Sequence, residues 1–205
     1  ATLQGFFRSL TDSNGMAFII LAEVEDTDAL RDAIAGTGAL QVLVATEEQR
    51  IESATVYIVP DGLGAALEND RLRFISGDAP EARQWRLDHF FTSLAEAQGE
   101  NSVCVILSGE GSDGTIGAKM IKERGGITIA KVGEGAAPGD SEMPQSAISS
   151  GLVDFAEVLE RIPDRLAQIR DGVSVIDLLV DDETGAQQDE QARQVQQEIA
   201  QILSS

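Results

Sequence analysis

The residue most able to do chemistry is an aspartate in a glycine-rich turn. Asp113 lies within residues 108–114, directly after the apolar, mostly β-branched run 103–107. Such a run is typical of a strand buried on both faces. The helical spacing that follows ends at the glycine pair 125–126, so strand, turn and helix form half of a βαβ unit. In open α/β folds such turns lie at the carboxyl edge of the sheet, where sites form, so Asp113 marks an expected site.

The elements that must position Asp113 follow from hydrophobic patterning. Continuous apolar runs predict buried strands, and stripes at intervals of three and four predict helices between them. Asn69-Asp70 suits the positive φ angles of a hairpin turn between residues 65–67 and 72–75. The sequence therefore predicts an α/β fold with one doubly wound, mainly parallel, Rossmann-like sheet and an antiparallel hairpin at one edge. The strands expected in that sheet are residues 16–21, 40–44, 55–59, 103–107 and 127–130.

The chain changes character near its end. We expect residues 1–180 to form the α/β domain and residues 181–205 to form a glutamine-rich linker followed by a helix. Val195, Ile199 and Ile202 give that helix an apolar stripe. A helix this short is marginal alone, so it would serve as a connector to another domain or as a dimer contact.

Composition excludes several classes of partner. The chain has 205 residues, and 15 basic against 35 acidic side chains give a net charge of −20, which repels nucleic acids and anionic lipids. No apolar run is long enough for membrane insertion, and the amino terminus lacks the pattern of a signal peptide. The single cysteine, Cys104, lies in a predicted buried strand and is expected to be a core residue. These features favour a cytoplasmic protein.

Several motifs carry a family resemblance. Ser-Gly-Glu-Gly-Ser-Asp-Gly at 108–114, Ile-Lys-Glu-Arg-Gly-Gly at 121–126, Met-Pro-Gln-Ser-Ala-Ile at 143–148 and Gly-Leu-Val-Asp at 151–154 resemble, in order and spacing, the catalytic domain of CheB-type chemotaxis protein-glutamate methylesterases. The resemblance covers nearly all of residues 1–165. The final helix also resembles the segment that joins this domain to a methyltransferase in fused methylesterase–methyltransferase sensory proteins.

The resemblance implies a serine, histidine and aspartate triad that needs no cofactor and hydrolyses glutamate methyl esters or deamidates glutamines on chemoreceptors. A serine hydroxyl needs a base, and the aspartate orients that base. Asp113 matches the aspartate, whereas Glu23 stands at the histidine position. The strand and turn that would carry the serine are absent from this sequence, and Glu110 replaces a usual Met or Thr. The residues expected to line the site are Ser108, Gly109, Glu110, Gly111, Ser112, Gly114, Met143 and Pro144.

The candidate residues also have simpler interpretations. Asp113 could be a helix cap or turn former, and Glu23 could act as a base if burial raised its pKa. Glu23, Glu110 and Asp113 could converge and hold Mg²⁺ or Ca²⁺, but acids at loop ends are more often solvated, so we expect no metal. His89 is expected on a helix surface.

These observations together predict a methylesterase-like domain that has lost its catalytic residues and acts as a regulatory or docking module in chemotaxis-type or two-component signalling. Its partners would be chemoreceptor or sensory-protein helices, a fused methyltransferase or kinase domain, or a second copy bound through the final helix. Two alternatives remain: an active esterase, and a small-ligand or metal-binding α/β domain.

Overall fold

The described part of the chain comprises residues 2–10, 13, 15–24, 26–38, 40–75, 85–133 and 142–172 of a computed structural model. The chain divides into two units, residues 1–167 and residues 168–205. Both the boundary expected at residue 180 and the expected terminal helix fall outside the described residues. No helix in the described ranges is long and apolar enough to cross a membrane.

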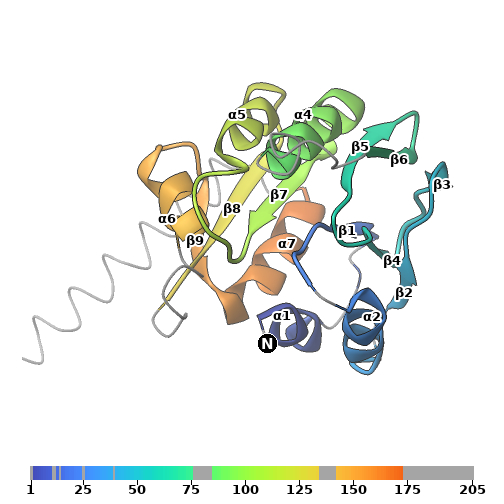
Figure 1. Cartoon of the computed structure of the whole chain (residues 1–205). Helices are drawn as coiled ribbons and strands as arrows, with labels where there is room; N and C mark the ends of the chain where they lie inside the picture. The colour runs from blue at the N-terminus through green and yellow to red at the C-terminus, as the bar shows by residue number, and fades with distance from the viewer. Residues whose placement is uncertain are drawn as a thin grey trace, which may run out of the picture. The chain divides into compact units, whose positions relative to one another are not determined.

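All five segments expected to be buried strands contain strands, and each pairs in parallel (Figure 1). Burial is as expected for the strands at 55–58 and 127–130, whereas the strands at 18–20 and 103–106 are partly buried and the strand at 41–44 is exposed or half-buried throughout. One sheet has the order β1-β4-β2, with register Phe18↔Val56 and Val42↔Val56. A second sheet has the order β7-β8-β9, with register Val103↔Ile127. The bounds are β1 Phe18–Ile20, β2 Gln41–Val44, β4 Thr55–Ile58, β7 Val103–Ile106, β8 Ile127–Val132 and β9 Phe155–Val158.

The expectation of one continuous parallel sheet is therefore corrected. Among the described strands, β1 and β7 are edge strands of separate sheets. An apolar run predicts that a strand is buried but does not identify its hydrogen-bonding neighbour. Both sheets nevertheless contribute to one hydrophobic cluster, in which Ile19 and Leu21 pack with the group that contains Cys104 and Ile106.

The predicted hairpin is present and belongs to a third, antiparallel sheet. Its strands β5 (Gly64–Glu68) and β6 (Arg71–Ile75) pair with register Leu67↔Leu72, and the short strand β3 (Gln49–Arg50) adds to β6. Asn69 and Asp70 have φ angles of 50° and 61°. Both values lie in the left-handed region that a tight hairpin turn requires, which explains this residue pair.

Helices lie between the strands along the chain, as the apolar stripes predict. Asp26 caps α2 by accepting the N–H of Ala29 at 2.9 Å. Helix α4 packs on α5 and on β5, and α6 packs on α5 and β8. The bounds are α1 Thr2–Ser9, α2 Thr27–Ala35, α4 Arg86–Gln98, α5 Thr115–Glu123, α6 Glu142–Ser149 and α7 Ile162–Arg170, with 3₁₀ turns η1 Gly99–Asn101 and η2 Leu159–Arg161.

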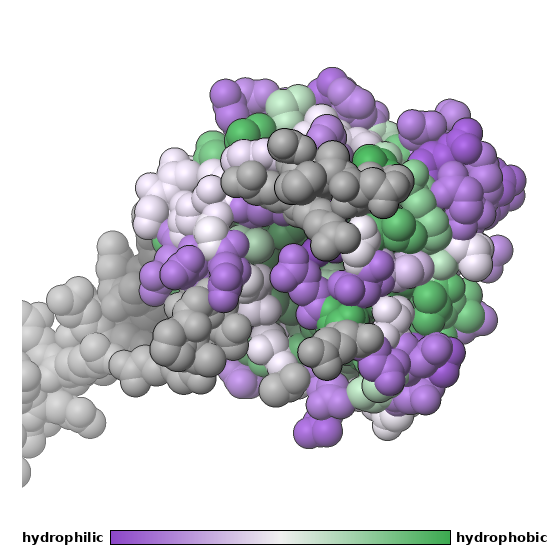
Figure 2. Space-filling model, in the orientation of Figure 1, coloured by the Kyte–Doolittle hydropathy of each residue, from purple (hydrophilic) through white to green (hydrophobic). Residues whose placement is uncertain are grey.

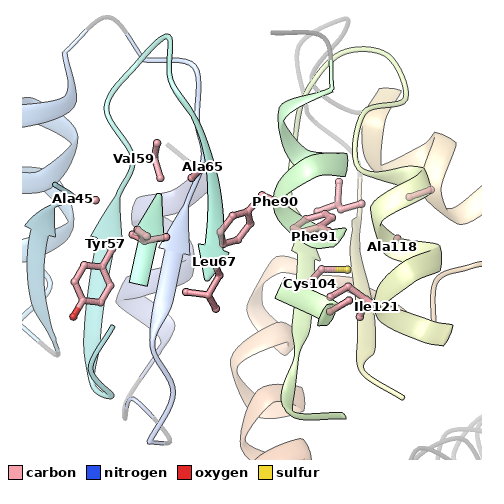
Figure 3. Packing of buried hydrophobic residues seen from close by; sticks show 14 of the residues in the cluster. Ala45, Tyr57, Val59, Ala65, Leu67, Phe90, Phe91, Cys104, Ala118 and Ile121 are labelled. Carbon is pink, nitrogen blue, oxygen red and sulfur yellow. The ribbon is translucent and has the colours of Figure 1, made fainter. Parts of the chain in front are cut away.

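Helix α4 connects the antiparallel sheet to the second parallel sheet through its two adjacent phenylalanines. Figure 3 shows the ring of Phe90 directed toward the β5 side chains Ala65 and Leu67, while Phe91 faces the side of β7 and α5. Cys104 lies in this core, and burial raises the pKa of its thiol to about 12. A thiol with so high a pKa carries almost no thiolate at neutral pH, so Cys104 is a core residue rather than a nucleophile.

Candidate functional site

The glycine turn that precedes α5 lies against the beginning of α6. The N–H of Met143 donates to the carbonyl of Gly109 at 3.0 Å, and the N–H of Gly111 donates to the Glu142 carboxylate at 3.1 Å. A Cβ at Gly109, where φ is 135°, would lie 2.6 Å from Cε of Met143. A φ of 135° is one that residues with a side chain rarely adopt, which favours glycine at 109. The structure brings Met143 to the turn, as expected of a residue that lines the site.

The other predicted lining residues surround this contact. Four of them are exposed: Ser108, Glu110, Gly111 and Ser112. Gly114 is buried, and a Cβ at this position would contact the side chains of Phe91 and Leu87. Pro144 is buried within α6.

Asp113 binds the first turn of a helix that is distant in sequence. Its Oδ2 accepts the N–H of Leu87 at 3.0 Å, and its Oδ1 accepts those of Asp88 at 3.0 Å and Gly114 at 2.8 Å. The residue preceding α4 is Trp85, whose side chain makes no capping hydrogen bond to the described residues. Asp113 therefore satisfies amide groups that the beginning of α4 would otherwise leave without an acceptor. The simpler interpretation, a helix cap, describes this geometry.

Asp88, in turn, caps the first turn of α5. Its Oδ1 accepts the N–H of Gly117 at 2.7 Å, and the N-cap position of α5 is Gly114, which has no side chain to do so. The two helices can approach this closely because Gly117 lacks a Cβ, which would lie 2.6 Å from the Cβ of Phe91. The two aspartates thus form a reciprocal cap, in which each carboxylate binds the first turn of the other helix.

Burial raises the pKa of Asp88, and the nearby negative charge of Asp113 raises it further. The Oδ2 of Asp88 is buried without a hydrogen-bond partner among the described residues. A buried oxygen without a partner disfavours the ionised carboxylate, since it receives no compensation for lost hydration.

Replacing Asp88 with asparagine should change how stability depends on pH. A carboxyl with a raised pKa holds its proton more tightly in the folded protein, so its stabilising contribution falls as pH rises above its ordinary pKa of 3.8. The wild type should therefore lose stability relative to Asp88→Asn as pH rises from 3.8 through the raised pKa of Asp88 in the folded protein. The difference should level off once Asp88 is ionised. Parallel urea unfolding of the two proteins at several pH values measures this difference. A difference independent of pH would contradict it.

Glu23 lies beside the same helix start but is engaged by an arginine. Its Oε1 is 3.1 Å from a guanidinium nitrogen of Arg86, the first residue of α4, and its own side chain is 84% exposed. Arg86 also donates to the carbonyl of Leu63 at 3.4 Å. The carboxylate of Glu23 is thus exposed and ion-paired, not buried as a candidate base was expected to be.

The three acids expected at the sheet edge do not converge. Glu23 faces Arg86, Asp113 faces the α4 amides, and Glu110 is exposed. Across the described residues, no group of three or more histidine, cysteine, aspartate or glutamate side chains could hold a metal ion.

In the described part of the chain, His89 does not form a nucleophile and base pair with the helix serines Ser9 and Ser93. His89 is exposed on α4, as expected. The hydroxyl of Ser93 donates to the carbonyl of Phe90 at 2.8 Å and accepts the N–H of Leu67 at 2.9 Å. Ser9 donates to carbonyls of its own helix, at 2.9 Å to Phe6. These hydroxyls have structural roles.

Sequence reasoning missed Arg86 and Asp88. Asp88 carried one available signal, because an acid in the first turn of a helix is typical of helix beginnings. Nothing in the sequence pairs Arg86 with Glu23, which is 63 residues earlier.

Comparisons with known proteins agree with the motifs. Residues 1–166 match the family model described as CheB methylesterase. A 104.1 kDa uncharacterized protein of Rhodobacter capsulatus is 36% identical over 129 residues, which cover 60% of this chain and 13% of that protein. A protein-glutamate methylesterase/protein-glutamine glutaminase of Rhizobium meliloti is 34% identical over 149 residues, covering 72% of this chain and 41% of that protein.

A solved structure supports the fold. The CheB methylesterase catalytic domain of Thermotoga maritima matches with a TM-score of 0.68 and 25% identity, covering 82% of this chain and 91% of that one.

Proposed function

Because this chain belongs to the CheB methylesterase family, we propose that it is a catalytically degenerate member, which acts as a regulatory or docking module in chemotaxis-type or two-component signalling. The observation that carries the proposal is the pairing of Glu23 with Arg86 at 3.1 Å, at the position where the resemblance implies a histidine base. A triad requires an imidazole that takes the serine proton and then returns it to the leaving group. An exposed, ion-paired carboxylate supplies neither step efficiently.

The surroundings of Asp113 support the same proposal. A triad aspartate must accept a hydrogen bond from an imidazole. The Asp113 carboxylate instead accepts the backbone N–H groups of Leu87, Asp88 and Gly114. Asp113 is best regarded as a triad relic that remains because it holds the beginning of α4.

The proposed setting is a larger sensory protein in the cytoplasm. The Rhodobacter relative, of which only 13% matches, is consistent with a methylesterase-like segment inside a much longer chain. The partners we propose are chemoreceptor or sensory-protein helices, or a fused methyltransferase or kinase domain.

The test is methanol release from carboxyl-methylated receptor peptides, with the Thermotoga catalytic domain as the active reference. The chain should release methanol at the rate of buffer alone, because losing one triad member typically removes several orders of magnitude of rate. Glu23→His should not restore activity. Turnover above the buffer rate would overturn the proposal and support an active methylesterase/glutaminase, the activity named for the Rhizobium relative.

A further inference from the structure

A groove runs beside α4 and shares Asp88 with the reciprocal cap. Its volume is about 430 Å³, and its lining comes from the hairpin, the α4 side chains and the first turn of α5. His89, Thr92, Ser93 and Glu96 recur at intervals of three and four, so one face of α4 forms a wall. Ala66 and Ile75 of the hairpin contribute apolar surface to the lining.

The groove gathers exposed apolar surface. Of the described large hydrophobic residues, Trp85, Ile116 and Val158 are exposed, at 38%, 60% and 40%. Trp85 and Ile116 both line this groove. On the face drawn in Figure 2, hydrophobic surface occurs as separate areas among hydrophilic side chains. Exposed tryptophan and isoleucine that meet in one concave site are typical of a protein interaction surface, where tryptophan often contributes much of the binding energy.

The charge of the groove indicates which partner fits. Its lining includes the carboxylates of Asp88 and Glu96, and no lysine or arginine is among the described residues that form it. Glu96 is exposed and has no ion-pair partner in the described part of the chain. An acidic side chain beside an apolar groove favours a partner that carries both apolar and basic side chains.

We propose that this groove docks a cationic amphipathic helix of a partner protein, whose apolar side chains contact Trp85 and Ile116 and whose lysine or arginine faces Glu96. The proposal deepens the docking role proposed above, and rests on it only for the setting. It names a surface and a partner chemistry that do not depend on the candidate active site.

The experiment uses Trp85 as its own reporter, because it is the only tryptophan of the chain. The probe is a short, tryptophan-free peptide with leucine and lysine at helical spacing, and the control peptide has glutamate in place of each lysine. The lysine peptide should shift Trp85 emission to shorter wavelength as it removes water from the indole, whereas the glutamate peptide should not.

Matched variants locate the binding. Ile116→Ser and Glu96→Lys should each lower the affinity for the lysine peptide by about tenfold. Val158→Ser removes another exposed apolar residue, outside the lining, and Glu160→Lys reverses an exposed acid outside it. Both should leave the affinity unchanged.

The proposal is overturned if the lysine peptide leaves Trp85 emission unchanged, if the glutamate peptide binds equally well, or if Ile116→Ser binds like Val158→Ser. This outcome is separate from methanol release. If the chain neither releases methanol nor binds the peptide, only the docking proposal is refuted. If it releases methanol and also binds the peptide, only the proposed loss of catalysis is refuted.

Discussion

Replacing Asp113 with alanine is expected to lower the free energy of unfolding by about 2–4 kcal/mol, since hydrogen bonds to a charged acceptor each contribute about 1.5–3 kcal/mol and are not additive. The substitution removes the acceptor of the N–H groups of Leu87, Asp88 and Gly114 at once. Because these groups are only partly buried, water would satisfy some of them, so the loss stays below the sum. Urea unfolding followed by far-UV circular dichroism gives the value.

Asp26→Ala is the matched control, because Asp26 caps α2 within its own helix through one exposed hydrogen bond. That substitution should cost less, about 0.5–2 kcal/mol, as for ordinary N-caps. Asp113→Asn should fall between wild type and Asp113→Ala, since the amide keeps one acceptor oxygen. Equal losses for the two alanine variants would contradict a special structural role for Asp113.

Replacing Arg165 with methionine should destabilise the protein by about 3–5 kcal/mol, the usual cost of removing one partner of a buried ion pair. Arg165 and Glu157 are only 4% and 5% exposed. The guanidinium donates to Oε1 of Glu157 at 3.0 and 2.6 Å and lies 4.4 Å from the centre of the Phe155 ring. Of the described cations paired with Glu157, Arg161 would remain, with its Nε 3.6 Å from Oε2 and its side chain 64% exposed. The buried carboxylate would therefore stay charged with weaker compensation or take up a proton.

The comparison that isolates this effect is the double variant Glu157→Gln with Arg165→Met, which removes the buried charge and should recover much of the lost stability. Arg31→Met provides a surface reference, because Arg31 pairs with Asp28 and Asp32 in exposed positions and should change stability little. The predicted role of the buried ion pair would be refuted if Arg165→Met lowered the free energy of unfolding no more than Arg31→Met does.

Much of the fold could be predicted from the sequence because burial leaves a strong local signal. The apolar runs 16–21, 40–44, 55–59 and 103–107 all contain strands, and Asn69-Asp70 predicted its turn. The division into two parallel sheets could not be predicted, because strand pairing depends on contacts between distant segments. Strand β3 was not predicted, because a strand of two residues is too short to show a hydrophobic pattern.

The candidate site was predictable in location more than in chemistry. The glycine turn identified Asp113, and the motif spacing brought Met143 to Gly109, where their backbones are hydrogen-bonded. The capping of α4 by Asp113 and the pairing of Glu23 with Arg86 required the tertiary structure, since both link residues more than twenty positions apart. The roles assigned to Asp113 and Glu23 by resemblance remain proposals.

The reciprocal cap also has a consequence for the order in which the chain folds. The first turn of α4 needs the carboxylate of Asp113, and the first turn of α5 needs that of Asp88, across 25 to 29 residues of intervening chain. Because each helix beginning gains its side-chain acceptor only when the other segment is in place, we expect the two first turns to form together rather than one after the other. In native-state fluctuations we expect the amides of Leu87, Asp88 and Gly117 to open as one cooperative unit, joined by two carboxylates rather than by backbone continuity.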